Sequence, residues 1–567
     1  MSRLAKLKAC ESLSDLARLI GYKPRSLGFL IHQIDDDAKY TEFEIPKKSG
    51  GTRKISAPIA RLKAVQVRLA DLLYDCVDEI NRENVVKTHI SHGFRRGRSI
   101  FTNADQHTGK RYVLNIDLAD FFPSINFGRI KGFFEKNNHF QLKSPVALAI
   151  AQLCCNKGVL PQGSPTSPVI SNLIGHILDM RLVKLADKFG CTYTRYADDI
   201  TFSTNKRTFP KALAKRKLCA SDDWSVGKDL RRTVERSGFT INPHKTRMQY
   251  YYSRQVVTGL TVNKRPNVSQ AYYKKTRAMC DRLFQTGSAH ELIETTDTDG
   301  EKKQEEQPVS IASLFGRMDH IFHAKMFGKQ QPSFNDYSKP AGFLEVYQNL
   351  VFFDFCVQNS KPTIICEGRT DVVYLKHALK SLYKDYPDLI SKETSGFVFK
   401  VRFVHHYKRR SRSLGIFDGA DNLVSFVHKF KNLNLKMKAP RTPHNTILLT
   451  DNDSGVMGKK KLFATVASET GSPCDGMKPS YEIVPGLHLV PVPKAKATDE
   501  VSIESLFDPA LLQKKVKGKS FNYLTKADPK TEYDKAYFAD KIVKPGYKKI
   551  NFDGFKPLLN AVTGAVA

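Results

Sequence analysis

The sequence predicts a multidomain protein in which an α+β part is followed by an α/β part with a mainly parallel sheet. Its 567 residues are about four times the length of a typical domain, and 41% of them are hydrophobic, which is enough for more than one core. In the first half, strand patterns at 112–117 and 195–202 flank a helical pattern at 169–182. In the second half, apolar runs at 363–366 and 446–450 each lead into an acidic turn, as strands of a parallel sheet do.

The chain is strongly basic, because 90 Lys and Arg outweigh 57 Asp and Glu and give a net charge of +33 at pH 7. Residues 361–567 contain 35 Lys and Arg against 21 Asp and Glu, so both halves carry the excess. Clustered basic residues gain affinity for phosphates by releasing counterions, which favours a nucleic-acid partner over a small metabolite. Residues 1–20 alternate charge with short apolar runs, and we therefore expect a cytoplasmic protein without membrane contact.

Shifts in composition indicate where the parts of the chain meet. Residues 286–308 are polar and acidic, which is typical of a flexible surface loop. A polar break at 359–362 precedes the apolar run that begins the second half. We therefore expect a first part at 1–250, a basic helical part at 251–345 that contains the acidic loop, a linker at 346–362, and an α/β domain at 363–567.

Three aspartates lie where strands are expected to end. Asp117 closes the strand pattern at 112–117, and Asp198 and Asp199 occupy the turn of the expected hairpin at 195–202. Phosphoryl transfer by two metal ions requires carboxylates from separate strands, because the ions lie about 3.5–4 Å apart and bind the attacking and leaving oxygens. These acids are candidate Mg²⁺ ligands, although an Asp-Asp pair on its own is more often simple turn chemistry.

A loop rich in Gly, Pro and hydroxyl residues at 158–168 lies between the two acid sites and contains Leu-Pro-Gln-Gly. Together with the upstream Asp117 and the Tyr-Ala-Asp-Asp sequence at 196–199, it resembles the reverse transcriptases, over about residues 25–320. The resemblance implies a right-hand polymerase, with fingers and palm in the first expected part and the thumb in the second. It also implies that Asp117, Asp198 and Asp199 hold two Mg²⁺ ions.

The same resemblance implies roles for residues around an incoming deoxynucleoside triphosphate. Phe122 would exclude a ribose 2′-OH, while Gln162 and Gly163 would line the nucleotide pocket. Arg53 would meet the triphosphate through a charge-assisted contact, and Lys245 would protonate or stabilise the pyrophosphate leaving group. For Arg53 and Lys245, a solvated basic surface is the competing explanation.

Two further motifs are similar to regions of the retron reverse transcriptases. Asn-Ala-x-x-His at 103–107 follows the basic segment His-Gly-Phe-Arg-Arg, and Val-Thr-Gly occupies 257–259. This resemblance implies a cognate structured noncoding RNA, DNA synthesis from a guanosine 2′-OH within it, and a branched product, multicopy single-stranded DNA. A-form RNA offers backbone and 2′-OH contacts, which suits a basic protein. The residues expected to contact this RNA are Arg95, Arg96, Asn103 and His107.

The second half places acids at the ends of two expected strands, in Glu-Gly-x-Thr-Asp at 367–371 and Asp-x-Asp at 451–453. Each motif alone is more often a solvated turn, but parallel strands would bring them to one sheet edge. Together they resemble the TOPRIM fold, and most closely the overcoming-lysogenization-defect nucleases. The resemblance implies a site for one or two Mg²⁺ ions. Its expected residues are the acids Glu367, Asp371, Asp451 and Asp453. Glu504 and Lys535 are candidate further members, for which an amphipathic helix with an incidental Glu or Lys is the competing explanation.

A retron reverse transcriptase fused to a TOPRIM nuclease implies antiphage defence, in which branched DNA holds a toxic effector inactive. The expected partners are the cognate RNA and its branched DNA, deoxynucleoside triphosphates, an RNA or DNA target of the nuclease, and further copies of the chain. One alternative is a mobile-element reverse transcriptase of the group II intron type. Another is that the TOPRIM half acts only as a nucleic-acid-binding or oligomerisation module.

Overall fold

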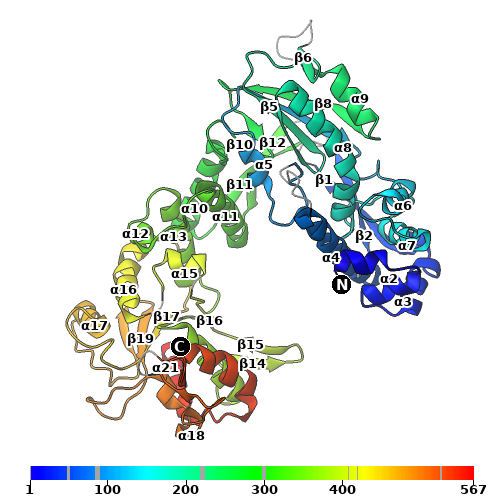
Figure 1. Cartoon of the computed structure of the whole chain (residues 1–567). Helices are drawn as coiled ribbons and strands as arrows, with labels where there is room; N and C mark the ends of the chain where they lie inside the picture. Colours follow the sequence, from blue (N-terminus) through cyan, green and yellow to red (C-terminus); the bar gives the residue numbers. More distant parts are fainter. Residues whose placement is uncertain are drawn as a thin grey trace. The chain divides into compact units, whose positions relative to one another are not determined.

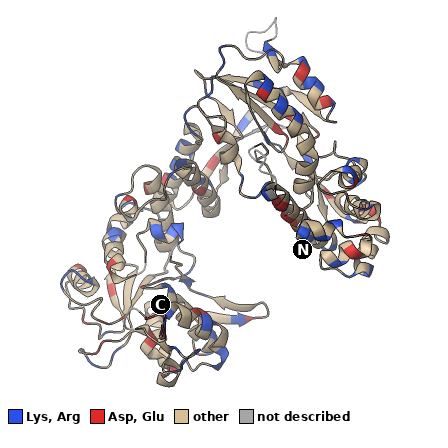
Figure 2. Cartoon of the chain, viewed as in Figure 1, with Lys and Arg blue, Asp and Glu red and all other residues tan. Residues whose placement is uncertain are grey.

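The computed structural model describes residues 2–47, 51–83, 90–216, 224–296, 302–406, 408–417, 419–523 and 527–566. The chain forms two compact units, an N-terminal unit at Met1–Ser269 and a C-terminal unit at Gln270–Ala567 (Figure 1). Lys and Arg are spread over both units (Figure 2). Among the described residues, no helix has the length and apolar character that a membrane crossing requires.

A four-stranded antiparallel sheet forms the centre of the N-terminal unit, in the order β4-β5-β3-β8. Its strands are β3 (Tyr112–Ala119), β4 (Thr192–Tyr196), β5 (Asp199–Thr204) and β8 (Thr240–Tyr250). Most β3 side chains are buried, because this strand has a neighbour on each side and a core on its faces. The long helix α8 (Ser167–Phe189) begins with Pro168 in its first turn and ends at Gly190 in the left-handed conformation (φ 64°), so local sequence sets both its ends.

Helices and hairpins surround this sheet and complete the N-terminal unit. The hairpin β1 (Tyr40–Pro46) and β2 (Thr52–Pro58) runs into α4 (Ala60–Glu83), which contributes to the same apolar core as α8. The other elements are α1 (Arg3–Lys8), α2 (Leu13–Leu19), α3 (Pro24–His32), α5 (Ile100–Asp105), α6 (Phe127–Lys136), α7 (Ser144–Cys154), β6 (Ala214–Arg216), β7 (Trp224–Val226), α9 (Lys228–Glu235), β9 (Val256–Val257) and β10 (Leu260–Thr261).

The C-terminal unit begins with helices and an antiparallel hairpin. The hairpin lies where the sequence predicted an acidic loop, at 286–308, so that prediction is wrong. The strands β11 (His290–Thr296) and β12 (Lys302–Pro308) form an antiparallel hairpin, and residues 297–301 lie outside the described residues. Basic side chains of the flanking helices α10 (Gln270–Thr286) and α11 (Ile311–Met326) pair with two of its acids. Lys275 and Arg317 both pair with Glu291, and Arg282 pairs with Glu306.

The predicted linker at 346–362 is also wrong over most of its length. Its first residues belong to α13 (Phe343–Phe352), and a π-helical turn follows at Phe353–Val357. Their apolar side chains recur every three or four residues and are buried, so this stretch belongs to a core. The boundary between compact units therefore falls at Ser269, and the helices expected to follow the palm lie within the C-terminal unit.

A five-stranded, mainly parallel sheet forms the second part of this unit, as the sequence predicts. Its order is β16-β13-β17-β19-β18, and only the edge strand β18 is antiparallel to its neighbour. The strands are β13 (Thr363–Cys366), β16 (Arg402–Phe403), β17 (Thr446–Thr450), β18 (Tyr481–Val484) and β19 (Leu487–Pro491). The longer helices here are α14 (Arg369–Ser381), α16 (Ala420–Asn434), α17 (Leu462–Thr470) and α21 (Lys556–Val566).

Candidate active sites

The sheet of the N-terminal unit brings the three predicted aspartates together. Asp117 on β3 lies opposite Asp199 at the start of β5 and opposite Asn242 on β8. The Leu118 N–H donates a hydrogen bond of 3.0 Å to the carbonyl oxygen of Asp198, which fixes the turn between β4 and β5 against β3. The neighbouring strands β3 and β5, with the turn before β5, thus bring three carboxylates together at one end of the sheet.

These carboxylates share a partly desolvated region. Burial, and then the charge of Asp117, raises the pKa of Asp198. Loss of water, together with the charges of Asp198 and Asp117, raises the pKa of Asp199 to about 7. Asp117 and Asp199 both line a cavity of about 320 Å³ on this side of the sheet. Negative charges held this close repel one another, and a cation would relieve that repulsion.

The donor set suits Mg²⁺, which prefers carboxylate and phosphate oxygens. Within the described ranges, no three His, Cys, Asp or Glu side chains already form a complete ligand set. Mg²⁺ in phosphoryl-transfer sites takes one or two protein carboxylates and completes its shell with substrate phosphates and water. A fully protein-built cage is therefore not required, and Asp117, Asp198 and Asp199 fit the partial set.

Lys245 on β8 contacts the acid site directly. Its Nζ donates a hydrogen bond of 2.9 Å to Oδ1 of Asp117, and this bond raises the pKa of the ammonium group. The Asp117 side chain is only 9% exposed, whereas that of Lys245 is 57% exposed. An ammonium group that is anchored to a buried carboxylate, yet open to solvent, is well placed to meet a phosphate.

Three other residues expected to bind a nucleotide lie on β2 or against it. The carbonyl oxygen of Gln162 accepts a hydrogen bond of 2.8 Å from the Ser56 N–H of β2. A Cβ added to Gly163 (φ 118°) would lie 2.9 Å from the Ser56 carbonyl oxygen, so the loop needs glycine at this close approach. Arg53 on β2 is close enough to Asp198 to lower the pKa of that carboxyl slightly.

Phe122 follows β3 and packs against two aromatic rings. Its ring centroid lies 5.4 Å from that of Phe121 and 6.1 Å from that of Phe94. Phe121 is buried in the core, and Phe122 is only partly buried. The ring of Phe122 is therefore held in place by packing while part of it stays accessible.

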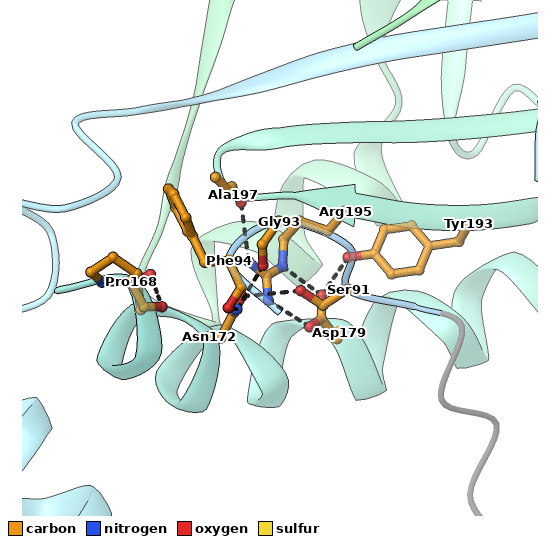
Figure 3. A network of polar contacts seen from close by, with 10 residues as sticks. Ser91, Gly93, Phe94, Pro168, Asn172, Asp179, Tyr193, Arg195 and Ala197 are labelled. Atoms are coloured by element: carbon orange, nitrogen blue, oxygen red, sulfur yellow. Dashed lines mark hydrogen bonds and ion pairs between the residues drawn. The ribbon is translucent and has the colours of Figure 1, made fainter. Parts of the chain in front are cut away.

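A buried ion pair beside the turn between β4 and β5 is a feature that sequence reasoning missed (Figure 3). Nε and Nη2 of Arg195 on β4 each donate a hydrogen bond of 2.7 Å to the carboxylate of Asp179 on α8. The Arg195 side chain is 0% exposed and that of Asp179 is 2% exposed. The hydroxyl of Tyr193 donates a further bond of 2.7 Å to Asp179. The sequence held one signal for this pair. Alternate residues of a strand share a face, so Arg195 would lie on the same face as Tyr193 and Ala197, which indicates that it points inward.

This ion pair also supports the backbone of the turn. Nη1 of Arg195 donates a hydrogen bond of 3.0 Å to the carbonyl oxygen of Ala197, which has a positive φ of 56°. A non-glycine residue at such a φ needs support from its surroundings. The Arg195–Asp179 pair is thus a structural link between α8 and the turn that carries Asp198.

The basic segment before α5 packs against the same turn. The Arg195 N–H donates to the Ile90 carbonyl oxygen and the His92 N–H donates to the Arg195 carbonyl oxygen, each at 2.8 Å. A Cβ on Gly93 would lie 2.5 Å from the Ala197 nitrogen, so glycine is required at this contact. Asn172 of α8 holds the segment by donating from Nδ2 to the Gly93 carbonyl oxygen at 2.7 Å. Residues 90–93 therefore help to place the turn that carries Asp198.

The structure contradicts the expected RNA contacts of Asn103 and His107. Both are buried, at 1% and 0% exposure, and the His107 ring bonds Ser203 and Thr194 at 2.7 Å each. The Thr194 hydroxyl donates to Asn103 at 2.7 Å, and burial lowers the pKa of His107 to about 3. The Asn-Ala-x-x-His motif instead fastens α5 to β4 and β5, which explains its spacing.

The two arginines of the preceding segment differ in their surroundings. Arg96 pairs with Asp75 at 2.8 Å and with Asp78 at 3.0 Å, and it lies over the Tyr74 ring. Arg95 is partly buried, which lowers its pKa, and it lines a cavity of about 320 Å³ beside α8. Arg96 is therefore committed to contacts within the chain, although its side chain is 45% exposed.

A pH dependence follows from the raised pKa of Asp199. At pH 6 this carboxyl is largely protonated and a poor metal ligand, whereas at pH 8 it is ionised. If the site catalyses a Mg²⁺-dependent reaction, the half-saturating Mg²⁺ concentration should fall by about tenfold between pH 6 and pH 8. Mg²⁺ titrations of nucleotide incorporation at several pH values would measure it, and an unchanged half-saturating concentration would contradict the assignment.

The C-terminal unit contains a second group of acids, at the carboxyl edge of its parallel sheet. Glu367 follows β13 and Asp451 follows the adjacent β17, and both line a cavity of about 1110 Å³. The Thr450 hydroxyl donates to Oε2 of Glu367 at 2.7 Å, and the Ile503 N–H donates to Oδ1 of Asp451 at 2.8 Å. Asp371, in the first turn of α14, accepts a bond of 2.8 Å from the Gly368 N–H.

Glu504 and Lys535 lie beside this group. Glu504 is fully buried, and its Oε2 accepts a bond of 3.0 Å from Nζ of Lys535. Its Oε1 is buried without a hydrogen-bond partner among the described residues. Desolvation and neighbouring acids raise the pKa of Asp371 to about 7 and that of Asp451 to about 8. This concentration of buried negative charge is unfavourable on its own and suits a cation-binding site.

Asp453 lies at the margin of the group. Its Oδ1 accepts a bond of 2.9 Å from the Gly455 N–H and so closes the turn after β17. Its charge contributes to raising the pKa of Glu367, so it is near that acid. The intervening Asn452 is buried and donates to the carbonyl oxygens of Gly476 and Val492. Asp453 therefore has a structural role in addition to any role as a ligand.

Comparison with known proteins identifies the N-terminal unit. The profile of the family "Reverse transcriptase (RNA-dependent DNA polymerase)" matches residues 45–281, which include the three aspartates of the N-terminal unit. Fold and site thus define a protein of the reverse transcriptase class.

Several curated relatives of this chain are retron reverse transcriptases. The Retron Mx65 reverse transcriptase of Myxococcus xanthus is 39% identical over 261 residues, which cover 42% of this chain and 55% of that protein. The Retron Mx162 reverse transcriptase of the same organism is 35% identical, over 46% of this chain and 55% of that protein. The Retron Ec86 reverse transcriptase of Escherichia coli is 32% identical over 49% of this chain and 80% of that protein. The chain belongs to the retron reverse transcriptase family, although it spans only about half the length of the two Myxococcus relatives.

Proposed function

We propose that this protein is an RNA-directed DNA polymerase that copies a cognate structured noncoding RNA into branched multicopy single-stranded DNA. The observation that carries the proposal is the convergence of Asp117, Asp198 and Asp199 at one sheet edge. Membership of the retron family supports the choice of template and of a 2′-OH primer, and it favours a retron over a group II intron enzyme.

Different residues of the chain would bind the metal ions, contact the phosphates and select the sugar during nucleotide addition. The three aspartates would hold two Mg²⁺ ions, which would stabilise charge on the attacking and leaving oxygens. Lys245, bound to Asp117, would meet the pyrophosphate, and Arg53 would meet the triphosphate. Phe122 would pack where a ribose 2′-OH would otherwise fit, so that deoxynucleotides are selected.

A primer-extension experiment tests this proposal. The full chain is co-expressed with its cognate RNA, purified, and supplied with Mg²⁺ and labelled deoxynucleoside triphosphates. Labelled DNA that remains attached to RNA until the 2′–5′ linkage is cleaved by a debranching enzyme would support the proposal. DNA that is never linked to RNA would argue against priming from a 2′-OH.

For the C-terminal unit, we propose a TOPRIM-type, metal-dependent nuclease that cleaves RNA or DNA and acts as the effector of antiphage defence. Glu367, Asp371 and Asp451 meet at the carboxyl ends of parallel strands, where open α/β sheets place their ligands. Their raised pKa values and the buried Glu504 support a cation site, with one or two Mg²⁺ ions as the expected occupants. Branched DNA would hold this nuclease inactive until phage activity alters the DNA.

Substitution Glu367→Gln is expected to abolish cleavage, cell toxicity and phage protection while leaving DNA synthesis unchanged. The amide keeps the size of the side chain but removes the charge that a Mg²⁺ ligand needs. A matched control is Glu469→Gln on α17, which removes a carboxylate whose ion-pair partners His428 and Lys431 are exposed. Phage plaque counts and labelled DNA yield measure the two activities, and full protection by the Glu367→Gln variant would show that the C-terminal unit acts without this chemistry.

A further inference from the structure

The cavity beside the second acid group is lined by two kinds of side chain. Glu367, Asp371 and Asp451 belong to the acid group. Residues 516–523 and 527–537 contribute Tyr523, Tyr533 and Tyr537, the basic residues Lys517 and Lys519, and the acids Glu532 and Asp534. Acids that suit a metal ion thus share a cavity of about 1110 Å³ with aromatic rings and ammonium groups.

The aromatic residues near this cavity pack on one another. The Phe521 ring stacks on Phe538, with centroids 4.2 Å apart and planes 16° apart, and on Tyr533, at 5.4 Å and 14°. Tyr533 is fixed further by the bond from its hydroxyl to the Lys514 carbonyl oxygen at 3.0 Å. Tyr523 lies 5.3 Å from Phe521, and Tyr537 lies 5.3 Å from Tyr533. Tyr523 and Tyr537 therefore extend a packed aromatic stack to the cavity, where both are only half-buried.

This arrangement matches the chemistry of a nucleotide in an unpaired strand. Single-stranded nucleic acid is bound by aromatic rings that stack on bases and by basic residues that follow the phosphates. In a duplex, both faces of each base are covered by neighbouring bases, so a base can stack on a tyrosine only after leaving the helix. A small metabolite would not need several tyrosines and lysines along a cavity of about 1110 Å³.

We propose that the cavity binds single-stranded nucleic acid, with one base stacked on Tyr523 or Tyr537 and the adjoining phosphate directed to Glu367 and Asp451. The inference rests on the proposed nuclease function for the cleavage step, and it names the substrate class of that site. Lys517 lines the cavity and is exposed, and it would contact the next phosphate along the strand. In this proposal, Tyr523 and Tyr537 make the site prefer unpaired strands.

A photocrosslinking experiment tests binding separately from cleavage. The full-length Asp198→Asn variant, which should make no DNA, is mixed in Ca²⁺ with oligonucleotides that carry 5-bromouracil. Single-stranded DNA, single-stranded RNA and the matching duplexes are compared. Crosslinks from either single strand mapped by mass spectrometry to Tyr523 or Tyr537 support the proposal, and the DNA and RNA arms identify the sugar. Crosslinks at these tyrosines only from duplex, or none there from any strand, would overturn it.

Cleavage in Mg²⁺ gives the second readout. Tyr537→Ala should lower kcat/KM for a single strand by about tenfold or more, mainly through KM, and Tyr537→Phe should restore it because the ring is retained. Tyr547→Ala is the control, since Tyr547 packs on His377 and does not line the cavity. If the tyrosines crosslink but no strand is cut, the nuclease proposal fails and the binding site stands. If strands are cut and duplex is preferred in both the parent and the Tyr537→Ala variant, the binding inference fails and the nuclease stands.

Discussion

Substitution Asp179→Ala is expected to destabilise the N-terminal unit by about 3–5 kcal/mol. It leaves the Arg195 guanidinium in the core without its two carboxylate bonds, and an unpaired buried charge costs far more than a lost surface pair. Trp224 is the single tryptophan of the chain and lies in this unit, so its fluorescence during denaturation reports this unit alone. The midpoint of that transition should fall sharply in the variant.

The matched control is Asp37→Ala in the same unit. Asp37 pairs with Lys157 at 3.1 Å, but both side chains are largely exposed, at 78% and 57%. Exposed pairs contribute about 1 kcal/mol or less, so this variant should unfold almost as the parent does. Equal stability of the Asp179→Ala and Asp37→Ala variants would show that the buried pair does not support the turn.

Substitution Asp198→Asn should reduce DNA synthesis by about a thousandfold or more. The amide is nearly isosteric with the carboxylate but removes a charged Mg²⁺ ligand, and metal ions supply several kcal/mol of transition-state stabilisation. Folding should be unaffected, because neutralising an acid whose pKa is raised removes an unfavourable charge. Labelled nucleotide incorporation measures the loss, and Trp224 fluorescence verifies the fold.

Asp187→Asn provides the comparison for that loss, since Asp187 lies near the end of α8 and is exposed. Its incorporation rate should equal that of the parent. Substantial synthesis by the Asp198→Asn variant would contradict the assignment of Asp198 as a metal ligand.

The sequence was informative where local pattern and chemistry coincide. The strand pattern before Asp117 and the hairpin of Asp198 and Asp199 predicted that these acids come together, and Asp117 lies opposite Asp199, although β3 continues to Ala119. Apolar runs that precede Glu367 and Asp451 predicted strands of one parallel sheet, and β13 and β17 pair in parallel. In both cases, the acid and the strand pattern before it carry the same information.

Prediction failed where long-range packing decides the environment of a polar residue. Asn103 and His107 are polar and were expected at a surface, but β4 and β5 supply hydroxyl partners that allow their burial. Arg195 and Asp179 lie on different elements, and only the tertiary fold brings their charges into one pair. Similarly, the hairpin at His290–Pro308 places Glu291 and Glu306 beside basic side chains of the flanking helices, which the sequence pattern alone does not show.

The most direct test of the account is to sequence the nucleic acid that copurifies with the full chain and to treat it with a debranching enzyme. The account predicts a single structured RNA joined through a guanosine 2′-OH to DNA that is complementary to part of it. It also predicts that the DNA is missing from the Asp198→Asn preparation. Linear DNA without a 2′–5′ linkage, or branched DNA that persists in the Asp198→Asn preparation, would contradict it.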